Sequence, residues 1–432
     1  MKKISRRSFL TAAALGTILA ACGSKPASST PASSGSTPAG STPAGAVDPS
    51  SHKKFKIAIL EVQLNDESTN RANWFKNYIA PRYNCEFIFS EAINTLDAAM
   101  TFIENAADSG CDAIINYYAF SANTQQLIEL CRDKGMVLCE NGGRNKMNEA
   151  AYVAGYENFG GAFMADQPDT GKKFYDYLKA NLDTSKPHGF IIGTGAAYQG
   201  NAQQTEISSN MLTALEELYG LKFEKTKEEL YQSDAPIEGK NDKGIEVYLY
   251  PGSPSAQGWL EGLNAAMQTK KYDYVMMAGN VIGNIMTTVG ELEDSLGMDF
   301  TVLGFGTFGD ALTSAMNAKD KFGNQALSMS TVKFTSIVST MAFCETYNML
   351  TGHGDVLKDA DGNPNVLLFR MNAVTSPEQL AEMSSWDTEG KWVADYDFID
   401  SVLADFTPGL TAEKIQENIY ALDYDAIKAR LG

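Results

Sequence analysis

Two glycines follow an apolar run at a spacing that could begin a dinucleotide-binding turn. The run GFIIG spans residues 189–193, and Gly193 and Gly195 match the first two glycines of that turn. The turn also needs a third glycine, and an acidic residue about 20 positions on at the end of the next strand. Tyr198 occupies the third position, and Glu216, at the right distance, lies inside a helical run. We therefore predict no cofactor and interpret this loop as the lip of a ligand cleft.

Hydrolytic and metal chemistry have few residues to use. No Gly-x-Ser-x-Gly elbow occurs, and the three histidines are too few and too scattered for a Ser/His/Asp set or a histidine metal site. The segment DADGNP at residues 359–364 lacks the distal glutamate of a calcium loop, so we predict a turn there and no metal site. Acidic residues are abundant, which leaves paired carboxylates for glycoside cleavage as an open alternative.

Alternating strands and helices must position any site in this chain. From residue 55 onward, short apolar runs such as 55–60 and 111–118 alternate with amphipathic helical stretches, and the pattern begins again near residue 151. Such alternation predicts mostly parallel sheets with helices on both faces. We therefore predict an α/β fold of two doubly wound, Rossmann-like lobes joined by a hinge of three crossings.

The predicted parts of the chain follow from its composition and periodicity. They are a signal peptide at 1–21, a lipidated disordered linker at 22–54, an N-terminal lobe at 55–157 and 307–350, a C-terminal lobe at 158–306 and 351–375, and an aromatic-rich C-terminal extension at 376–432 packed on a lobe.

The N-terminal segment predicts export and a membrane anchor. A cationic start precedes a 13-residue apolar run, which is shorter than the ~20 residues of a membrane span and is typical of a signal peptide. SRRSFL at 5–10 resembles the twin-arginine export signal, and LAAC at 19–22 resembles a bacterial lipobox, which implies lipidation of Cys22. An unmodified Cys22 in a Sec signal is the alternative. A Ser-, Pro- and Gly-rich stretch then predicts a flexible tether, so we expect an extracytoplasmic, lipid-anchored location.

Charge and cysteine content limit the partners. The chain carries a net charge of −18, and removal of residues 1–21 takes away four basic residues and no acidic one, which leaves −22. Such a charge disfavours nucleic acid as a partner. The five cysteines after Cys22 lie in or beside apolar segments, so we interpret them as buried hydrophobic residues. A disulfide between Cys131 and Cys139 is the alternative.

Six segments resemble, in order and spacing, the landmarks of the type I periplasmic sugar-binding proteins of ABC transporters. They are KIAIL…LNDESTN, DSGCDAIIN, CRDKGMVLCEN, VAGYENFGGAF, AGNVIGNI and VLGFGTFGDAL. The resemblance runs from about residue 55 to residue 375. It implies a periplasmic-binding-protein-like type I fold, with a ligand held between the two lobes. Open α/β sheets in general bind ligands outside the carboxyl ends of their strands.

The loops after the strands therefore supply the candidate site. Polar side chains there can bind hydroxyl groups, and aromatic faces can cover the apolar side of a ligand. The predicted ligand-binding residues are Asn65, Asp66, Asn70, Tyr118, Asn141, Arg144, Glu157, Asn158, Gln199, Asn201 and Asn280. Glu157, Asn158 and Asn280 are placed by matching family positions. For the Asx residues, a turn or helix cap is the alternative role.

The chain departs from the family pattern at three positions in the second lobe. Val281 stands where the family has aspartate, Gly306 stands where a carboxylate is usual, and Thr205 or Glu206 takes the approximate place of an arginine. The usual charged contacts to a monosaccharide are therefore missing. A larger saccharide or another polar solute is the alternative ligand.

The resemblance and the residues together imply a non-enzymatic function. We expect a monomeric solute-binding lipoprotein that captures a small polar ligand by hinge closure and delivers it to an ABC permease in the membrane. The family resemblance makes a carbohydrate the expected ligand. The alternatives are a ligand-sensing receptor subunit for a membrane kinase and a lipid-anchored glycoside hydrolase.

Overall fold

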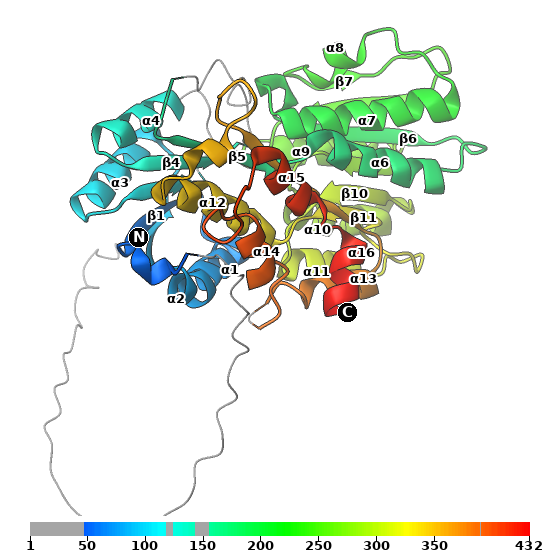
Figure 1. The fold of residues 1–432 in the computed structure, drawn as a ribbon. Helices are drawn as coiled ribbons and strands as arrows, with labels where there is room; N and C mark the ends of the chain where they lie inside the picture. The colour runs from blue at the N-terminus through cyan, green and yellow to red at the C-terminus, as the bar shows by residue number, and fades with distance from the viewer. Residues whose placement is uncertain (1–46, 118–123, 143–154, 389) are drawn as a thin grey trace, which may run out of the picture. The chain divides into compact units, whose positions relative to one another are not determined.

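The computed structural model describes residues 47–117, 124–142, 155–388 and 390–432, which Figure 1 shows as a ribbon. Their strands form two sheets with helices on both faces, so the predicted α/β fold of two doubly wound lobes is confirmed. Signal peptide, Cys22 and most of the linker lie outside the described residues. Within the described part of the chain, no helix has the length and apolar character needed to cross a membrane.

The first sheet has six strands, and every neighbouring pair is parallel. In spatial order they are β12 (Val366–Phe369), β5 (Phe159–Ala165), β4 (Val137–Asn141), β3 (Ala113–Asn116), β1 (Phe55–Glu61) and β2 (Cys85–Ala92).

Successive side chains of β1 point to opposite faces of this sheet, as the period of two requires. Ala58 and Leu60 pack under α3 (Leu96–Asp108) and α4 (Thr124–Asp133). Ile57 and Ile59 pack on the other face. The elements that cover that face are α1 (Asp66–Asn73), the π-helical turn η2 (Trp74–Ile79), α2 (Ala80–Arg82) and α12 (Thr335–Leu350).

The second sheet has seven strands, with a parallel centre and an antiparallel strand at each edge. In spatial order they are β13 (Asn372–Val374), β11 (Met329–Val332), β10 (Thr301–Phe305), β9 (Tyr274–Met277), β6 (Gly189–Gly195), β8 (Glu246–Pro251) and β7 (Ile237–Glu238).

Helices cover both faces of the second sheet. One face carries α6 (Gln167–Asn181) and α7 (Ala202–Tyr219), with α8 (Lys227–Tyr231) beside them. The other face carries α9 (Trp259–Gln268), α10 (Ile282–Leu296) and α11 (Asp310–Asn317).

Among the described residues, the chain passes between the two sheets at three places. The first crossing joins β5 to α6, the second joins β11 to α12, and the third joins β12 to β13. The expected segment boundaries misplace three of these strands. β5 and β12 were expected in the C-terminal lobe but pair with each other in the first sheet, and β11 was expected in the N-terminal lobe but pairs with β10. Hydrogen bonding between strands decides the sheet of each strand, and local periodicity does not report it; for β5 and β12 the partner also lies far along the chain.

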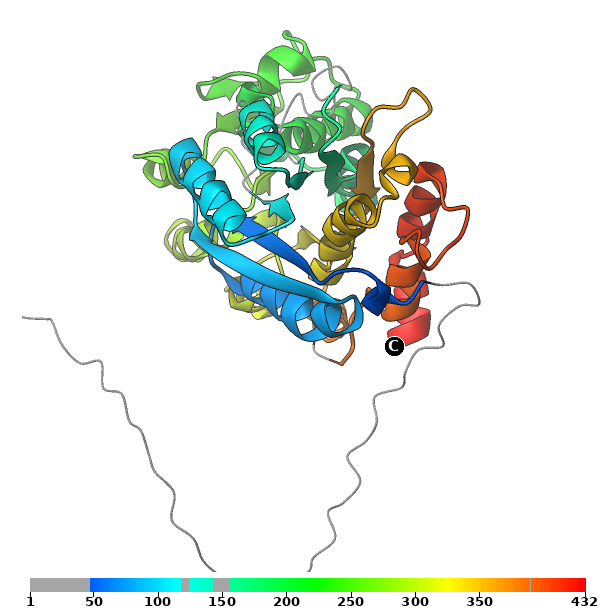
Figure 2. The same cartoon turned by 60° about the vertical axis from the view of Figure 1, so that its left-hand side comes forward.

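The C-terminal extension forms α13 (Pro377–Ser384), α14 (Tyr396–Ser401), α15 (Ala412–Tyr420) and α16 (Tyr424–Leu431). Trp386 and Ile399 are buried in the same core as the first sheet. In the turned view of Figure 2, the red helices of the extension lie beside the gold helix α12. Asn348 of α12 joins the two, because its side chain hydrogen-bonds the backbone at Val402 and Ala404. The five cysteines after Cys22 are all buried, and none of them is in a disulfide, as expected.

Candidate functional site

A cleft of about 550 Å³ opens at the carboxyl ends of the strands of both sheets. This is where open α/β sheets bind ligands, and the volume is in the usual range for a small-molecule site. Its polar lining residues are Gln63, Glu67, Asn141, Tyr198, Gln199, Asn201, Gln203, Gln204, Ser253, Asn280, Thr307 and Lys333. Its large apolar ones are Trp259, Met277, Val281, Phe305, Phe369 and Met371.

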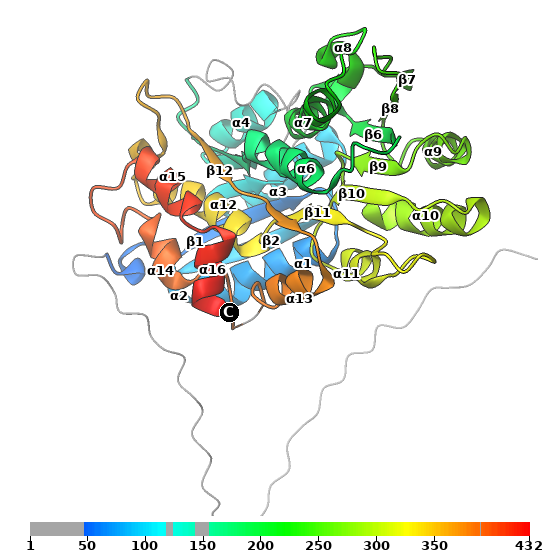
Figure 3. The same ribbon diagram turned by 90° about the vertical axis from the view of Figure 1, so that its right-hand side faces the viewer.

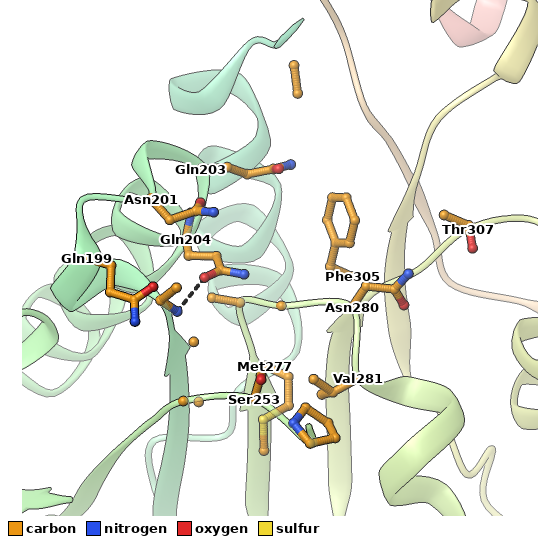
Figure 4. Close-up of a pocket in the computed structure, with 18 of the residues that line it drawn as sticks. Gln199, Asn201, Gln203, Gln204, Ser253, Met277, Asn280, Val281, Phe305 and Thr307 are labelled. Atoms are coloured by element: carbon orange, nitrogen blue, oxygen red, sulfur yellow. Dashed lines mark hydrogen bonds between the residues drawn. The ribbon is translucent and has the colours of Figure 1, made fainter. Parts of the chain in front are cut away.

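The loop after β6 brings a group of amides to the cleft. Asn201 caps α7, with its Oδ1 accepting from the Gln204 backbone amide at 3.0 Å. The side-chain Oε1 of Gln204 then accepts from the backbone N–H of Ala196 at 2.5 Å. Figure 4 shows Gln199, Asn201 and Gln204 close together on one side of the cleft. The result is a wall of side chains that can both donate and accept hydrogen bonds.

Glycines make room for this wall. A Cβ at Gly195 would lie 2.5 Å from Gln204 Oε1, and a Cβ at Gly279 would lie 3.1 Å from Gln204 Nε2. Gly195 also has a φ of +59°, a conformation that side chains disfavour. The Gly193 and Gly195 pair thus accommodates the protein's own methionine and glutamine side chains, since a Cβ at Gly193 would lie 2.2 Å from Met277 Sδ. This packing agrees with the interpretation of the loop as a cleft lip.

The loops after β8, β9 and β10 complete the wall of the second lobe. Trp259 is fixed in place because its indole N–H donates to the carbonyl of Pro251 at 3.0 Å. Asn280 is exposed at the start of α10, and Figure 4 shows it beside Phe305. A Cβ at Gly306 would lie 2.8 Å from Ser330 Oγ and 3.2 Å from Leu312 Cδ1, so a larger residue there would require these side chains to move.

A chain of ion pairs lies on the opposite side of the cleft. Lys333 Nζ, at the second crossing, contacts Glu67 of α1 at 2.9 Å. Glu67 also contacts Arg71 at 3.3 Å, and Arg71 holds Glu61 with two hydrogen bonds of 2.8 and 2.9 Å. The guanidinium carbon of Arg71 lies 3.7 Å from the centre of the Tyr117 ring. This chain links the first lobe to the hinge.

The charge of Glu67 is satisfied within the protein. Burial raises the pKa of this carboxyl, but the charges of Lys333 and Arg71 outweigh burial and lower the pKa to about 2. Among the described residues that line the cleft, Glu67 and Lys333 are the ones with ionisable carboxylate or amine groups, and they neutralise each other. The cleft therefore presents polar walls to a ligand, and the two charged groups in its lining form an ion pair with each other.

A second buried carboxyl lies behind the cleft. Glu140, at the end of β4 and next to Asn141, is fully buried and accepts a hydrogen bond from Thr124 Oγ1 at 3.0 Å. Burial outweighs its hydrogen bonds with Thr124 and Asn116 and raises its pKa to about 8. The side chain is therefore largely protonated at neutral pH.

The structure brings four of the predicted ligand-binding residues together in the cleft. These are Asn141 of the first lobe and Gln199, Asn201 and Asn280 of the second. Tyr118 and Arg144 lie outside the described residues.

The other five predicted residues lie outside the cleft lining. Asn65 caps α1 through Ser68, Asp66 lies in the first turn of that helix and Asn70 is half-buried in it. The amide of Asn158 donates to the carbonyls of Ile128 and Met136. Glu157 is exposed and lines a separate hollow beside Lys358. Asn65 and Asn158 thus have the capping and structural roles that were the alternative.

Several cleft residues were not predicted as ligand-binding. Gln203 and Gln204 lie in the first turn of α7, directly before Thr205 and Glu206, one of which takes the approximate place of the missing arginine. Ser253 and Thr307 each lie two residues beyond the end of a strand, so the expectation of polar residues in the loops after strands could have found them. Lys333 also lines the cleft, and its side chain is 16% exposed and paired with Glu67. Trp259 carried no signal, since it begins a helix after a long loop.

The acidic group best placed for a cation lies away from the cleft. Glu293, Asp299 and Asp320 bring their carboxylate oxygens within 4.8 Å of one another. Glu293 is at the C-terminal end of α10, and the other two precede β10 and β11, at the edge of the sheet opposite the cleft. Burial raises the pKa of Glu293 to about 7. The segment 359–364 forms a turn, in which Asp359 Oδ1 accepts from the backbone of Asp361 and Asn363.

No described protein family matches the sequence, and no curated protein matches it. Solved structures do match. A solute-binding protein of an ABC transporter from Bacillus halodurans C-125, with bound myo-inositol, has 17% identity and a TM-score of 0.53, and the match covers 77% of this chain and 98% of that one. A solute-binding protein from Burkholderia graminis C4D1M, in complex with D-arabinose, has 12% identity and a TM-score of 0.54, covering 78% and 99%. One from Clostridium phytofermentas, with bound L-rhamnose, has 12% identity and a TM-score of 0.53, covering 77% and 99%. At these identities the likeness is one of fold, and the chain has the type I periplasmic-binding-protein fold.

Proposed function

We propose that this protein is an extracytoplasmic solute-binding protein that captures an uncharged, hydroxyl-rich ligand of the carbohydrate class and delivers it to an ABC importer. The observation that carries the proposal is the cleft wall built from Gln199, Asn201, Gln204 and Asn280, with Trp259 beneath it. Amides donate and accept at once, as a hydroxyl group does. The carbohydrates and inositol in the matched solute-binding proteins support this ligand class.

Capture follows from the three crossings. Two lobes joined by a few crossing segments can close on a ligand by rotating about them. Closure would bring Gln63 and Asn141 of the first lobe towards the amides of the second, and would remove water from around the ligand. The closed form would then differ in shape from the open form, which is what a membrane permease must distinguish.

A ligand screen tests the proposal. The protein is heated in the presence of myo-inositol, D-arabinose, L-rhamnose, D-allose, D-ribose, oligosaccharides, amino acids, nucleosides and NAD. A ligand at about 100 times its Kd stabilises the folded state by about 2.7 kcal/mol, which raises Tm by several degrees. A shift by one or more saccharides is expected. A shift by amino acids or nucleosides alone would contradict the carbohydrate class, and a shift by NAD would contradict the cleft-lip interpretation.

Asn280→Ala locates the site. The Asn280 side chain is exposed and lines the cleft, so loss of its amide should weaken binding of the saccharide from the screen by about 1–3 kcal/mol, measured by calorimetry. Asn181→Ala, at the exposed end of α6 and away from the cleft, is the control and should leave the affinity unchanged. Equal affinities of the two variants would remove Asn280 from the site.

We also propose that Cys22 carries the membrane anchor and that the twin-arginine pair of Arg6 and Arg7 directs export. The LAAC and SRRSFL segments support these assignments. Cys22→Ser should move the protein from the membrane fraction to the soluble extracytoplasmic fraction. Replacing both arginines with lysine should leave the precursor in the cytoplasm; continued export would indicate the Sec route.

A further inference from the structure

The C-terminal extension, residues 376–432, contacts all three crossings of the hinge. At the first crossing, Asp166 caps α6 and its backbone N–H donates to Phe369 at 2.7 Å. The other oxygen of the same carboxylate accepts a hydrogen bond of 2.5 Å from the hydroxyl of Tyr420, at the end of α15. Arg370 packs over the Tyr420 ring, 4.7 Å from its centre. The extension is therefore tied to the segment where the chain first leaves the N-terminal lobe.

At the second crossing, the extension caps α12. The carboxylate of Asp387 accepts from both the backbone N–H and the hydroxyl of Ser336, and that hydroxyl in turn accepts from the Ala394 backbone at 3.0 Å. Phe334 packs on Trp386 with 6.2 Å between ring centres. Asp387 and Trp386 are both buried, so this contact is part of the protein core.

At the third crossing, two glutamines of the extension bind the backbone. Gln416 accepts from the N–H of Leu368 and donates to its carbonyl, each at 2.8 Å, which places an amide along the free edge of β12. Gln379 binds the backbone at the end of β13: its side chain accepts from the N–H of Thr375 at 3.0 Å and donates to the carbonyl of Ala373 at 3.1 Å. Figure 3 shows α15 next to β12 and α13 next to α11.

The extension is also fixed to each lobe separately. On the first lobe, Asp400 of α14 contacts Arg82 at 2.5 Å and accepts from the hydroxyl of Tyr83 at 2.7 Å. The ring of Tyr396 stacks on Tyr78, 4.1 Å between centres. On the second lobe, α13 packs against α11. A segment that holds both lobes and every crossing cannot stay unchanged when the lobes rotate.

We propose that residues 376–432 act as a strap that sets the angle between the lobes and so controls the free energy of closure. The part of this proposal that concerns affinity rests on the proposed function. When a ligand binds one arrangement of the lobes better than another, part of its binding free energy is spent on moving the strap. Loosening the strap therefore changes the apparent affinity without any change in the cleft.

The test combines Tyr420→Phe with Gln416→Ala, which loosens the first and third crossings and leaves Asp387 and Trp386 in place. Tyr175→Phe is the matched control, because its hydroxyl donates to the carboxylate of Glu217 at the same 2.5 Å but joins two helices of one lobe. Gln416→Met alone is a second, milder variant. Each is made in the full chain with Cys22→Ser, where the remaining native cysteines are buried.

The readout that needs no ligand is the distance between spin labels at Glu104→Cys on α3 and Glu291→Cys on α10, both exposed positions. We expect the distance distribution to broaden or shift in the double variant and in Gln416→Met, and to stay as in the parent protein in Tyr175→Phe. Affinity for the saccharide from the screen should change by about fivefold or more in the double variant. Unchanged distances overturn the strap. A screen without any saccharide ligand overturns the proposed function but leaves the distance result to decide the strap.

Discussion

At the scale of single residues, the cleft depends on where side chains are absent. Gly195 and Gly279 lie on either side of the Gln204 amide, and Gln204 is held by the backbone of Ala196. The amide is therefore fixed before any ligand arrives, which reduces the entropy lost on binding. Gly195 and Gly279 thus make room for the Gln204 side chain, as Gly193 does for Met277.

Gly195→Ala tests that packing against a control with the same backbone. Gly195 and Gly220 have φ values of +59° and +60°, but a Cβ at Gly220 would have nothing within 4 Å. Both variants should lose about 1–2 kcal/mol from the left-handed conformation. Gly195→Ala should lose more, because its methyl group displaces Gln204, and it should also weaken saccharide binding. Urea denaturation measures the difference, and equal losses would show that the Gln204 amide moves freely.

Glu140 gives the protein a pH dependence of known sign. Its pKa is about 8 when folded, against about 4.5 when exposed, so the unfolded state gives up its proton first. The free energy of unfolding should therefore fall as pH rises from 4.5 to 8, and the loss is complete above that range. Glu140→Gln removes this term. Its stability should match the parent protein near pH 4.5 and exceed it at pH 8 to 9 in urea titrations.

The control for that pH series is Glu104→Gln, on the exposed side of α3. This substitution also removes one carboxyl group, but an exposed one. Should the difference in stability between Glu140→Gln and the parent protein be the same at pH 4.5 and at pH 9, Glu140 would have to be ionised and hydrated in the folded protein.

Sequence patterns could identify part of the site at this scale. Asn141 ends β4 and Asn280 follows β9, and the carboxyl ends of the strands in a parallel sheet meet at one edge, so the place of both residues in the cleft was predictable. Asn65 also follows a strand but caps α1, and Asn158 directly precedes β5, so it lies at the amino end of that strand and donates to backbone carbonyls. The same amide serves a helix end or a ligand equally well, and only the three-dimensional neighbours distinguish the two.

At the scale of elements, α1 is attached to β1 by a buried ion pair. Arg71 and Glu61 are both buried and share two hydrogen bonds, and Tyr117 covers the guanidinium. Such a pair is costly to break from one side, because the remaining charge stays in the core. This contact positions Glu67 one turn earlier on α1, where it meets Lys333 of the hinge.

Arg71→Met should therefore cost about 3–5 kcal/mol of folding free energy, since it leaves Glu61 buried without its partner. Lys172→Met on α6 is the comparison, because its pair with Asp176 is exposed and worth at most about 0.5 kcal/mol. Chemical denaturation of both variants gives the two values. A loss below about 1 kcal/mol for Arg71→Met would mean that water reaches Glu61 in the folded protein.

Elements were easier to predict than their sheet membership. The alternation of apolar runs and amphipathic stretches located β1, β3 and β6, because side-chain periodicity is a local property. The sheets predicted for β5, β11 and β12 were wrong, because the sheet of a strand is decided by the strands that pair with it, and side-chain periodicity does not report those partners. Part of the cleft was hard to predict for the same reason, because Lys333, Phe369 and Met371 line it from segments at the crossings.

At the scale of the whole molecule, the overall charge and the charge of the cleft differ. The chain carries a net charge of −18, but the described cleft residues Glu67 and Lys333 neutralise each other. A long-range field acts on a charged ligand and not on a neutral one. The protein should therefore discriminate by ligand charge without using a charged residue for recognition.

Salt dependence tests this separation. The Kd of the saccharide from the screen should change by less than about twofold between 0.05 and 0.5 M NaCl, because added salt screens ion pairs between protein and ligand and leaves hydrogen bonds to neutral hydroxyls largely unaffected. The corresponding sugar acid should bind more weakly, and should gain affinity as salt screens the net charge of −18. Isothermal titration calorimetry at several salt concentrations measures both. A neutral ligand whose affinity falls steeply with salt would require the Lys333–Glu67 pair to open on binding, and would make these two residues part of the recognition site.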